Sequence, residues 1–179
     1  MSNLHDRLDE IQGVTKVLAG DVRRLRQQCG PRALEEIDSG VSTGRRAYVR
    51  AVFALIEAVV EQHKQLVLDL ADQRLVSLAD GASEQLRKRT PYPPFRKNIR
   101  AVYEGAGDAF GRPFDTERTW RVLEFAIEIR HRITHPKAYM DCRVGVEDID
   151  AVEKAEECFR NVSNEFVKAA GEHRATHNW

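Results

Sequence analysis

Hydrophobic residues recur at steps of three and four along most of this chain, which is the spacing of one face of an α-helix. The pattern runs through five segments, at about residues 3–29, 45–79, 94–110, 115–135 and 146–171. Glycine, proline and polar residues interrupt it between these segments. We therefore expect an all-α protein, an up-and-down bundle of about five helices.

The apolar face is widest in the second segment, residues 45–79, which predicts a central helix with neighbours on more than one side. His63 lies at the edge of this face, where a histidine is more often a core residue than a ligand. Glu57 lies on the polar side together with Arg46 and Arg50. Ion pairing along the helix is the simpler explanation for Glu57, and support of a functional site is the alternative.

The clearest linker is the polar, glycine-containing stretch at residues 38–44. It predicts that residues 1–40 form an N-terminal helical extension packed on the bundle. Residues 41–179 would then form the bundle itself, and the two parts together one compact domain. Near the other end of the chain, Gly171 is expected to end the last helix.

Charge and cysteine content narrow the class of protein. Lysine and arginine balance aspartate and glutamate, 28 against 28, so the molecule as a whole is not an obvious nucleic-acid binder. No apolar run approaches the ~20 residues that span a bilayer, and the N-terminus lacks the apolar core of a signal peptide. Cys29, Cys142 and Cys158 have neither paired nor zinc-like spacing. We expect a cytoplasmic protein with reduced thiols and no membrane association.

One stretch has the local character of a nucleic-acid surface. Six positive charges lie between Glu84 and Glu104 with no acidic residue among them: Arg87, Lys88, Arg89, Arg96, Lys97 and Arg100. Tyr92 and Phe95 are interleaved with these charges. Basic side chains contact phosphates and aromatic rings stack on unpaired bases, so the stretch predicts an RNA-binding surface. The alternative is a solvated loop, stiffened by prolines, whose aromatic rings pack inward.

The segment at residues 128–137 carries the candidate chemistry. On a helical wheel Arg130 falls among apolar residues, whereas His131 and His135 fall on the opposite, polar face. A guanidinium stays charged, so a position facing the core requires a partner or a ligand. Pro136 should end the helix at Thr134 or His135. The His135 side chain can then swing toward Arg130, which would make a phosphate-handling pair.

The residues Arg130-His131-Arg132-Ile133-Thr134-His135 fit the Arg-x4–6-His signature of HEPN domains, including a polar residue directly after the arginine. The chain resembles these domains in layout from about residue 43 to residue 173, and in specific residues from 130 to 135. HEPN domains are small α-helical bundles. Many of them are metal-independent ribonucleases of toxin–antitoxin, CRISPR and antiviral systems.

The resemblance implies an endoribonuclease that leaves 2′,3′-cyclic phosphate and 5′-hydroxyl ends and uses no metal or other cofactor. Arg130 would bind the phosphate, His135 would transfer protons, and His131 is a further catalytic candidate, with Lys137 among the RNA contacts. The implied partners are RNA, a second copy of the chain that completes a composite active site, and an antitoxin or other regulatory protein. Some members are controlled through a tyrosine two residues after the histidine. That position is Lys137 here, which puts this mode of control in doubt.

Three alternatives remain open for the motif. In the first, the bundle has no such activity, Arg130 pairs with a buried acid, and His135 is an exposed residue at the end of its helix. In the second, His131 and His135 bind a metal ion, with Glu124 and Glu128 on the same stripe. In the third, a HEPN-like module binds nucleotide, RNA or a protein partner without catalysis.

Overall fold

The computed structural model describes residues 4–29, 40–79, 81–87 and 95–177. In this part of the chain the secondary structure is entirely helical, so the expected all-α bundle is confirmed. The α-helices are α1 (Leu4–Gln27), α2 (Gly40–Asp72), α3 (Ala82–Arg87), α4 (Phe95–Phe110), α5 (Thr116–Thr134) and α6 (Val146–His177). A short 3₁₀ helix, η1 (Tyr139–Cys142), lies between α5 and α6.

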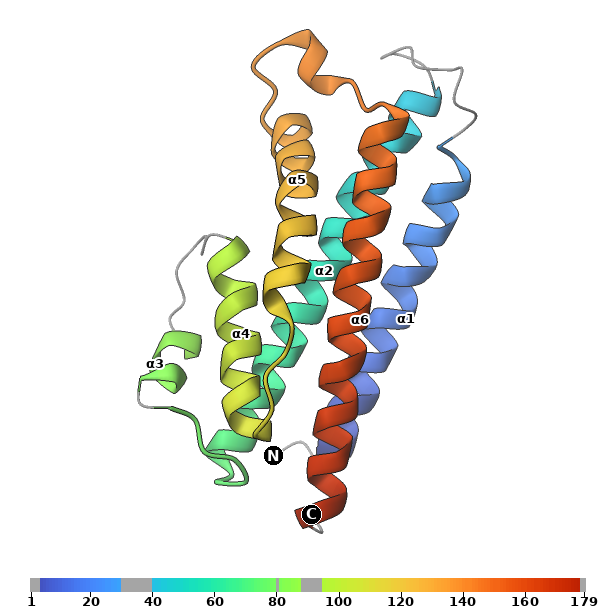
Figure 1. Ribbon diagram of the computed structural model, residues 1–179. Helices are drawn as coiled ribbons and strands as arrows, with labels where there is room; N and C mark the ends of the chain where they lie inside the picture. Colours follow the sequence, from blue (N-terminus) through green and yellow to red (C-terminus); the bar gives the residue numbers. More distant parts are fainter. Residues whose placement is uncertain (1–3, 30–39, 80, 88–94, 178–179) are drawn as a thin grey trace.

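The long helices alternate in direction along the bundle (Figure 1). The start of α1 and the end of α6 lie at one end, and the loop between α5 and α6 crosses the opposite end. The short helices α3 and α4 cover one side of α2 near the first end. None of the described helices combines the length and apolarity needed to cross a membrane.

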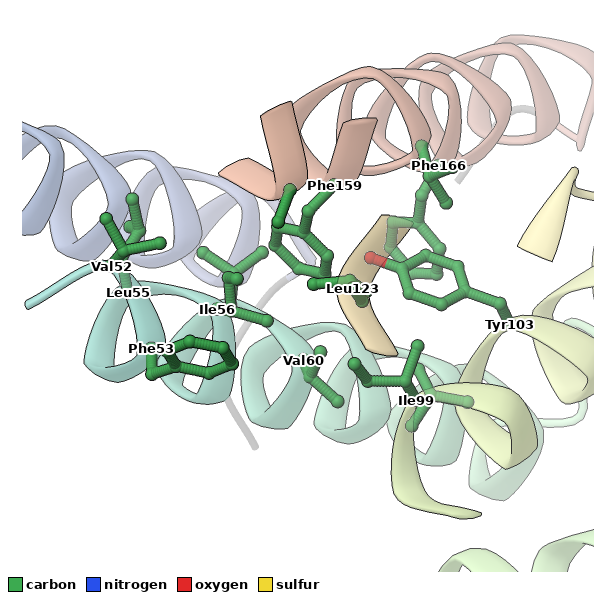
Figure 2. Packing of buried hydrophobic residues seen from close by; sticks show 14 of the residues in the cluster. Val52, Phe53, Leu55, Ile56, Val60, Ile99, Tyr103, Leu123, Phe159 and Phe166 are labelled. Atoms are coloured by element: carbon green, nitrogen blue, oxygen red, sulfur yellow. The ribbon is translucent and has the colours of Figure 1, made fainter. Parts of the chain in front are cut away.

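Helix α2 is the central element, as its wide apolar face predicts. It packs against α1, α4, α5 and α6. Figure 2 shows how its apolar residues meet aromatic and aliphatic side chains of α4, α5 and α6. The labelled residues of this core are Val52, Phe53, Leu55, Ile56, Val60, Ile99, Tyr103, Leu123, Phe159 and Phe166. Helix α1 adds Ile11 and Val22 to the same core. A division of the chain at residue 40 stays a prediction.

The start of α2 corrects the predicted linker. Residues 40–44 are the first turn of α2, whereas residues 38 and 39 lie outside the described chain. Gly44 has a packing role, because a Cβ atom there would lie 2.7 Å from the carbonyl oxygen of Gln28. The glycine therefore lets the start of α2 approach the end of α1 closely.

The end of α2 also differs from the prediction. The helix stops at Asp72 rather than near Ala79, and Arg74 takes a left-handed conformation with φ of 57°. The amide of Leu75 donates to the carbonyl of Leu70 (2.9 Å), and that of Arg74 to Ala71 (3.0 Å). These two bonds form a Schellman motif. Glycine usually occupies the left-handed position, and Arg74 gives no such signal in the sequence.

Two further expectations about helices were wrong. Gly171 does not end the last helix, because α6 continues to His177. Beyond the glycine, His173 is hydrogen-bonded to the Leu75 carbonyl (3.1 Å) and its ring lies 5.7 Å from that of Phe110. Helix α3, whose Leu86 is buried in the core, was not predicted either.

Candidate functional site

The site begins where α5 ends. The amide of His135 donates to the His131 carbonyl (2.9 Å), and α5 ends at Thr134, directly before His135-Pro136, as predicted. The Thr134 hydroxyl donates to the Arg130 carbonyl (2.7 Å), and Arg50 of α2 donates to the Ile133 carbonyl (3.3 Å). The bonds to His131 and Ile133 occupy carbonyl groups that the last turn of a helix leaves without an intrahelical partner, whereas the Thr134 hydroxyl bonds back to the preceding turn.

Arg130 reaches from α5 to the surface of α2. Its Nη2 lies 2.6 Å from Oε1 of Glu57, and its guanidinium carbon lies 5.4 Å from the centre of the Phe53 ring. The side chains of Arg130 and Glu57 are 34% and 45% exposed. The guanidinium is thus oriented by a carboxylate and an aromatic face while a third of the side chain stays accessible to solvent.

The two histidines lie together at the surface. Both residues are exposed, and their ring centroids are 5.1 Å apart with the planes inclined by 55°. This contact places the His135 ring beside that of His131, and the swing of His135 toward Arg130 stays a prediction. Two imidazoles therefore lie within one helical turn of each other at the end of α5.

The loop after α5 is held by a carboxylate at its tip. Oδ2 of Asp141 accepts hydrogen bonds from the backbone amides of Lys137 (2.7 Å) and Ala138 (2.8 Å). These two bonds lower the pKa of Asp141, because they stabilise its charged form. At the far end of the loop, Asp148 accepts from the amide of Gly145 (2.9 Å). The loop backbone is therefore fixed at both ends by acidic side chains.

Three arginines hold the end of the same loop by donating to backbone carbonyl groups of residues 142–144. Arg132 donates to the Arg143 carbonyl (2.5 Å) and pairs with Asp148 (2.8 Å). Arg46 donates to the Cys142 carbonyl (3.3 Å). Arg45 donates to the carbonyl groups of Cys29 and Val144, both at 3.1 Å, and is 1% exposed. Together these contacts connect the 142–144 backbone to α2, α5 and the end of α1.

The burial of Arg45 was not predicted, although the sequence carries a signal for it. Arg45 precedes Tyr48, Val49 and Val52 by three, four and seven residues, which places it on the apolar face of α2. The same wheel argument singled out Arg130. Applied to Arg45, it would have predicted a buried guanidinium with backbone or acidic partners.

The predicted basic surface is described only in part. Arg87 pairs with Asp72, Arg100 pairs with Glu104 (2.6 Å), and Lys97 is exposed. Lys88, Arg89 and Tyr92 lie outside the described residues, as does the side chain of Arg96. Helix α3, which carries Arg87, lies far from the end of α5 in Figure 1, so the structure does not bring Arg87 together with the histidines. Lys137 is exposed and lies two residues beyond His135.

A second polar cluster is buried in the core, away from the motif. His63 of α2 is fully buried, its Nδ1 is hydrogen-bonded to the Tyr103 hydroxyl (3.1 Å), and its ring stacks on Phe166 at 3.9 Å. Its Nε2 has no hydrogen-bond partner among the described residues. Burial lowers the pKa of His63 to about 3 and raises the pKa of Tyr103 well above its usual value. His63 is thus a neutral core residue, as expected.

Over the described ranges, no group of three or more histidine, cysteine, aspartate and glutamate side chains is placed to hold a metal ion. Searches of the chain against protein-family models, curated proteins and solved structures return no match.

Proposed function

We propose that this protein is a metal-independent endoribonuclease of the HEPN type, with its active site at the C-terminal end of α5. The observation that carries the proposal is the pair of exposed imidazoles of His131 and His135 there, with Arg130 in the same last turns of α5. Two exposed imidazoles lie 5.1 Å apart, and a partly exposed guanidinium lies one residue before the first of them. These are the group types that metal-free RNA cleavage requires.

In the proposed reaction a histidine takes the proton from a ribose 2′-hydroxyl, and the 2′-oxygen attacks the adjacent phosphorus. The bond from phosphorus to the 5′-oxygen breaks, and a second histidine, now acting as an acid, protonates that oxygen. The products are a 2′,3′-cyclic phosphate and a 5′-hydroxyl, and no water is consumed. Arg130 stabilises the charge that develops on the phosphate oxygens. His135 and His131 are the proton-transfer groups.

Glu57 and Phe53 have a positioning role in this proposal. A guanidinium presents its donors in one plane, so a carboxylate at 2.6 Å and a ring face at 5.4 Å together restrict where that plane points. Because the pair is partly exposed, a phosphate can approach the guanidinium from solvent. The exposure of both side chains also keeps the ion pair weak enough to rearrange when substrate binds.

The resemblance to HEPN domains supplies the remaining parts of the proposal. The active form is a cytoplasmic homodimer that brings two copies of the motif together across a two-fold axis. Its biological role is that of a toxin or of an antiviral, abortive-infection effector. An antitoxin or other regulatory protein restrains its activity.

One observation favours a second candidate function. Arg130 already has an acidic partner in Glu57, as expected of a structural arginine. In that case the domain is a non-catalytic, HEPN-like module that binds nucleotide, RNA or a protein partner. The two candidates differ in whether RNA is cut.

The deciding experiment is RNA cleavage in EDTA by wild type and by Arg130→Ala, His131→Ala and His135→Ala. The matched control is Arg121→Ala, which removes an exposed arginine from the same helix, paired with Glu117 at 3.6 Å. We expect Arg130→Ala and His135→Ala to lose about 100-fold or more in rate, while Arg121→Ala stays close to wild type. Circular dichroism must show that each variant is folded. Folded wild type that cuts no RNA would leave the non-catalytic module as the function.

A further inference from the structure

We propose that Arg50 of α2 binds a phosphate of the RNA strand next to the phosphate that is cut, and so adds a second arginine to the site. This inference rests on the proposed function, because it assigns a substrate contact beside the same histidines. Arg50 reaches the site from a different helix, through a contact between residues 83 positions apart, so the motif in α5 does not contain it.

The first step is the place that Arg50 reaches. Its Nη2 donates to the carbonyl oxygen of Ile133 at 3.3 Å. Ile133 belongs to the last turn of α5 and lies between His131 and His135 in the chain. Because consecutive Cα atoms are about 3.8 Å apart, the Cα atoms of Ile133 and His135 lie within about 8 Å of each other. The Arg50 guanidinium therefore lies at the end of α5 that carries the two imidazoles.

The second step is that Arg50 shares one face of α2 with the residues that orient Arg130. Phe53 and Glu57 follow Arg50 by three and seven residues, which is the spacing of one helix face. This face meets α5, because Phe53 and Glu57 both contact Arg130. At about 1.5 Å per residue, Arg50 and Glu57 are about 10 Å apart along α2. A strand that follows the contact between α2 and α5 (Figure 1) would meet Arg130 and Arg50 in turn.

The third step is that the Arg50 guanidinium has donors to spare. The residue is exposed, and its described contact is with a carbonyl group rather than with a carboxylate. At 3.3 Å this hydrogen bond is at the long, weak end for an N–H donor. A guanidinium has several N–H groups in a planar fork, so a bond to one carbonyl leaves others to bind a phosphate. A phosphate at Arg50 therefore displaces no acidic partner.

The fourth step is the charge of the two helices around Arg50. The described residues of α2 before Arg50 include no acid, and the first acid after it is Glu57, which is paired with Arg130. The last acid of α5 is Glu128, which lies about 140° around that helix from Ile133. The end of α5 that Arg50 reaches is therefore not covered by a carboxylate of either helix.

The acids at the start of α6 belong to a different surface. Glu147, Asp148 and Asp150 line a groove beside the loop between α5 and α6, and Arg50 is not among the described residues that line it. Arg132 faces this groove from α5 and is paired there with Asp148 (2.8 Å). Arg50 instead approaches the end of α5 from α2, so these acids do not oppose a phosphate bound to it.

The test must separate phosphate binding from a purely structural bond to the end of α5, which an arginine also stabilises. RNA binding is measured by fluorescence anisotropy in the His135→Ala background, so that cleavage does not interfere. The probe is a labelled single-stranded RNA of about 12 nucleotides, and the salt concentration is varied from about 50 to 500 mM. Arg50→Gln keeps an amide donor for the Ile133 carbonyl and removes the charge, whereas Arg50→Lys keeps the charge.

The loss of one phosphate contact should make the slope of log affinity against log salt concentration shallower by about 0.7. Arg50→Gln should therefore bind RNA about five-fold more weakly at the lowest salt concentration, and Arg50→Lys should restore the slope. Arg121→Gln is the matched control, because it removes the same charge from an exposed arginine of α5. It should leave the slope unchanged.

Each outcome decides the inference, and cleavage by the protein with His135 intact decides the proposed function separately. If that protein cuts RNA and Arg50→Gln behaves like Arg121→Gln, the phosphate contact is wrong and the nuclease stands. If Arg50→Gln weakens binding with an unchanged salt slope and a lower free energy of unfolding, Arg50 only holds the end of α5, which also overturns the inference. If RNA is bound but not cut and Arg50→Gln reduces the slope, the nuclease fails and the phosphate contact stands. If no RNA is bound, both fail.

Discussion

Two arginines, Arg45 and Arg130, occupy helix faces that otherwise carry apolar side chains, and their surroundings give them different uses. Arg45 is fully buried and donates to two backbone carbonyl groups. Arg130 is a third exposed and pairs with Glu57, which is itself almost half exposed. A buried guanidinium of the first kind stabilises the fold, whereas one of the second kind stays accessible to a phosphate.

Replacement of each arginine by alanine should separate these two uses. Arg45→Ala leaves buried carbonyl acceptors without a donor and opens a cavity, so we expect the free energy of unfolding to fall by at least about 2 kcal/mol. Arg130→Ala removes a partly exposed ion pair and a cation–π contact, which is expected to cost about 1 kcal/mol. Urea unfolding measures both values. A larger loss at Arg130 than at Arg45 would identify Arg130 as the structural arginine.

His63 should make the protein sensitive to acid. Its folded-state pKa is about 3, far below the ~6.5 of an unfolded histidine, so between these values the unfolded chain binds a proton that the folded protein does not. Stability therefore falls as the pH drops below about 6.5, and this contribution is constant above that pH. By pH 5 the free energy of unfolding of wild type should have fallen by about 2 kcal/mol, a loss that His63→Phe does not share.

The measurement that checks this is the free energy of unfolding as a function of pH, for wild type and for His63→Phe. His63→Phe removes the hydrogen bond to Tyr103, and that cost does not depend on pH in this range because Tyr103 stays protonated. The two proteins should therefore converge as the pH falls from 7 to 5. Parallel curves would show that His63 takes up its proton equally in both states.

At the scale of elements, the sequence predicts those helix ends that depend on local chemistry. Pro136 restricts the residue before it, so the end of α5 was predicted to within one residue. The end of α2 at Asp72 was not, because Arg74 adopts a conformation that glycine normally signals. At Gly171 the prediction was too short, because α6 was expected to end there and contacts made by His173 hold the helix beyond it. The end of α2 is thus a local conformation without its usual residue, the extension of α6 depends on tertiary contacts, and hydrophobic periodicity reports neither.

The same distinction applies to the candidate site. The Arg130–His135 spacing is a local property and can be read from the sequence. The partnership of Arg130 with Glu57 joins residues 73 positions apart, and the loop between α5 and α6 is bonded to Arg45 and Arg46, nearly 100 positions away. The His135 ring lies beside that of His131, and its direction relative to Arg130 stays a prediction.

The contact between α1 and α2 can be tested at Gly44. Within a helix, alanine is more favourable than glycine by about 1 kcal/mol. At position 44, however, a Cβ atom would lie 2.7 Å from the Gln28 carbonyl oxygen. We expect Gly44→Ala to lower the unfolding free energy by about 1–3 kcal/mol. Gly13→Ala is the matched control, because no atom lies within 4 Å of its Cβ position. That variant should be more stable than wild type by about 0.5–1 kcal/mol, so equal effects at both sites would contradict the close approach.

At the scale of the whole molecule, the proposed active site is completed either within one chain or between two copies of it. In the proposed reaction His131 and His135 are two proton-transfer groups of a single chain, whereas the proposed homodimer has two copies of each. The dimer predicts that cleavage activity per molecule falls on dilution, in parallel with dissociation measured by sedimentation. Constant activity per molecule in a monomeric sample would assign both acid and base to one chain.

The most direct test of the account is the chemistry of the cut. An end-labelled single-stranded RNA and its 2′-O-methyl counterpart are incubated in EDTA with wild type and with His135→Ala, and the product ends are identified. The account predicts that wild type cuts only the RNA with 2′-hydroxyl groups, that the fragments carry 2′,3′-cyclic phosphate and 5′-hydroxyl ends, and that folded His135→Ala cuts neither. Cleavage of the 2′-O-methyl strand, or no cleavage of either strand by folded wild type, would contradict it.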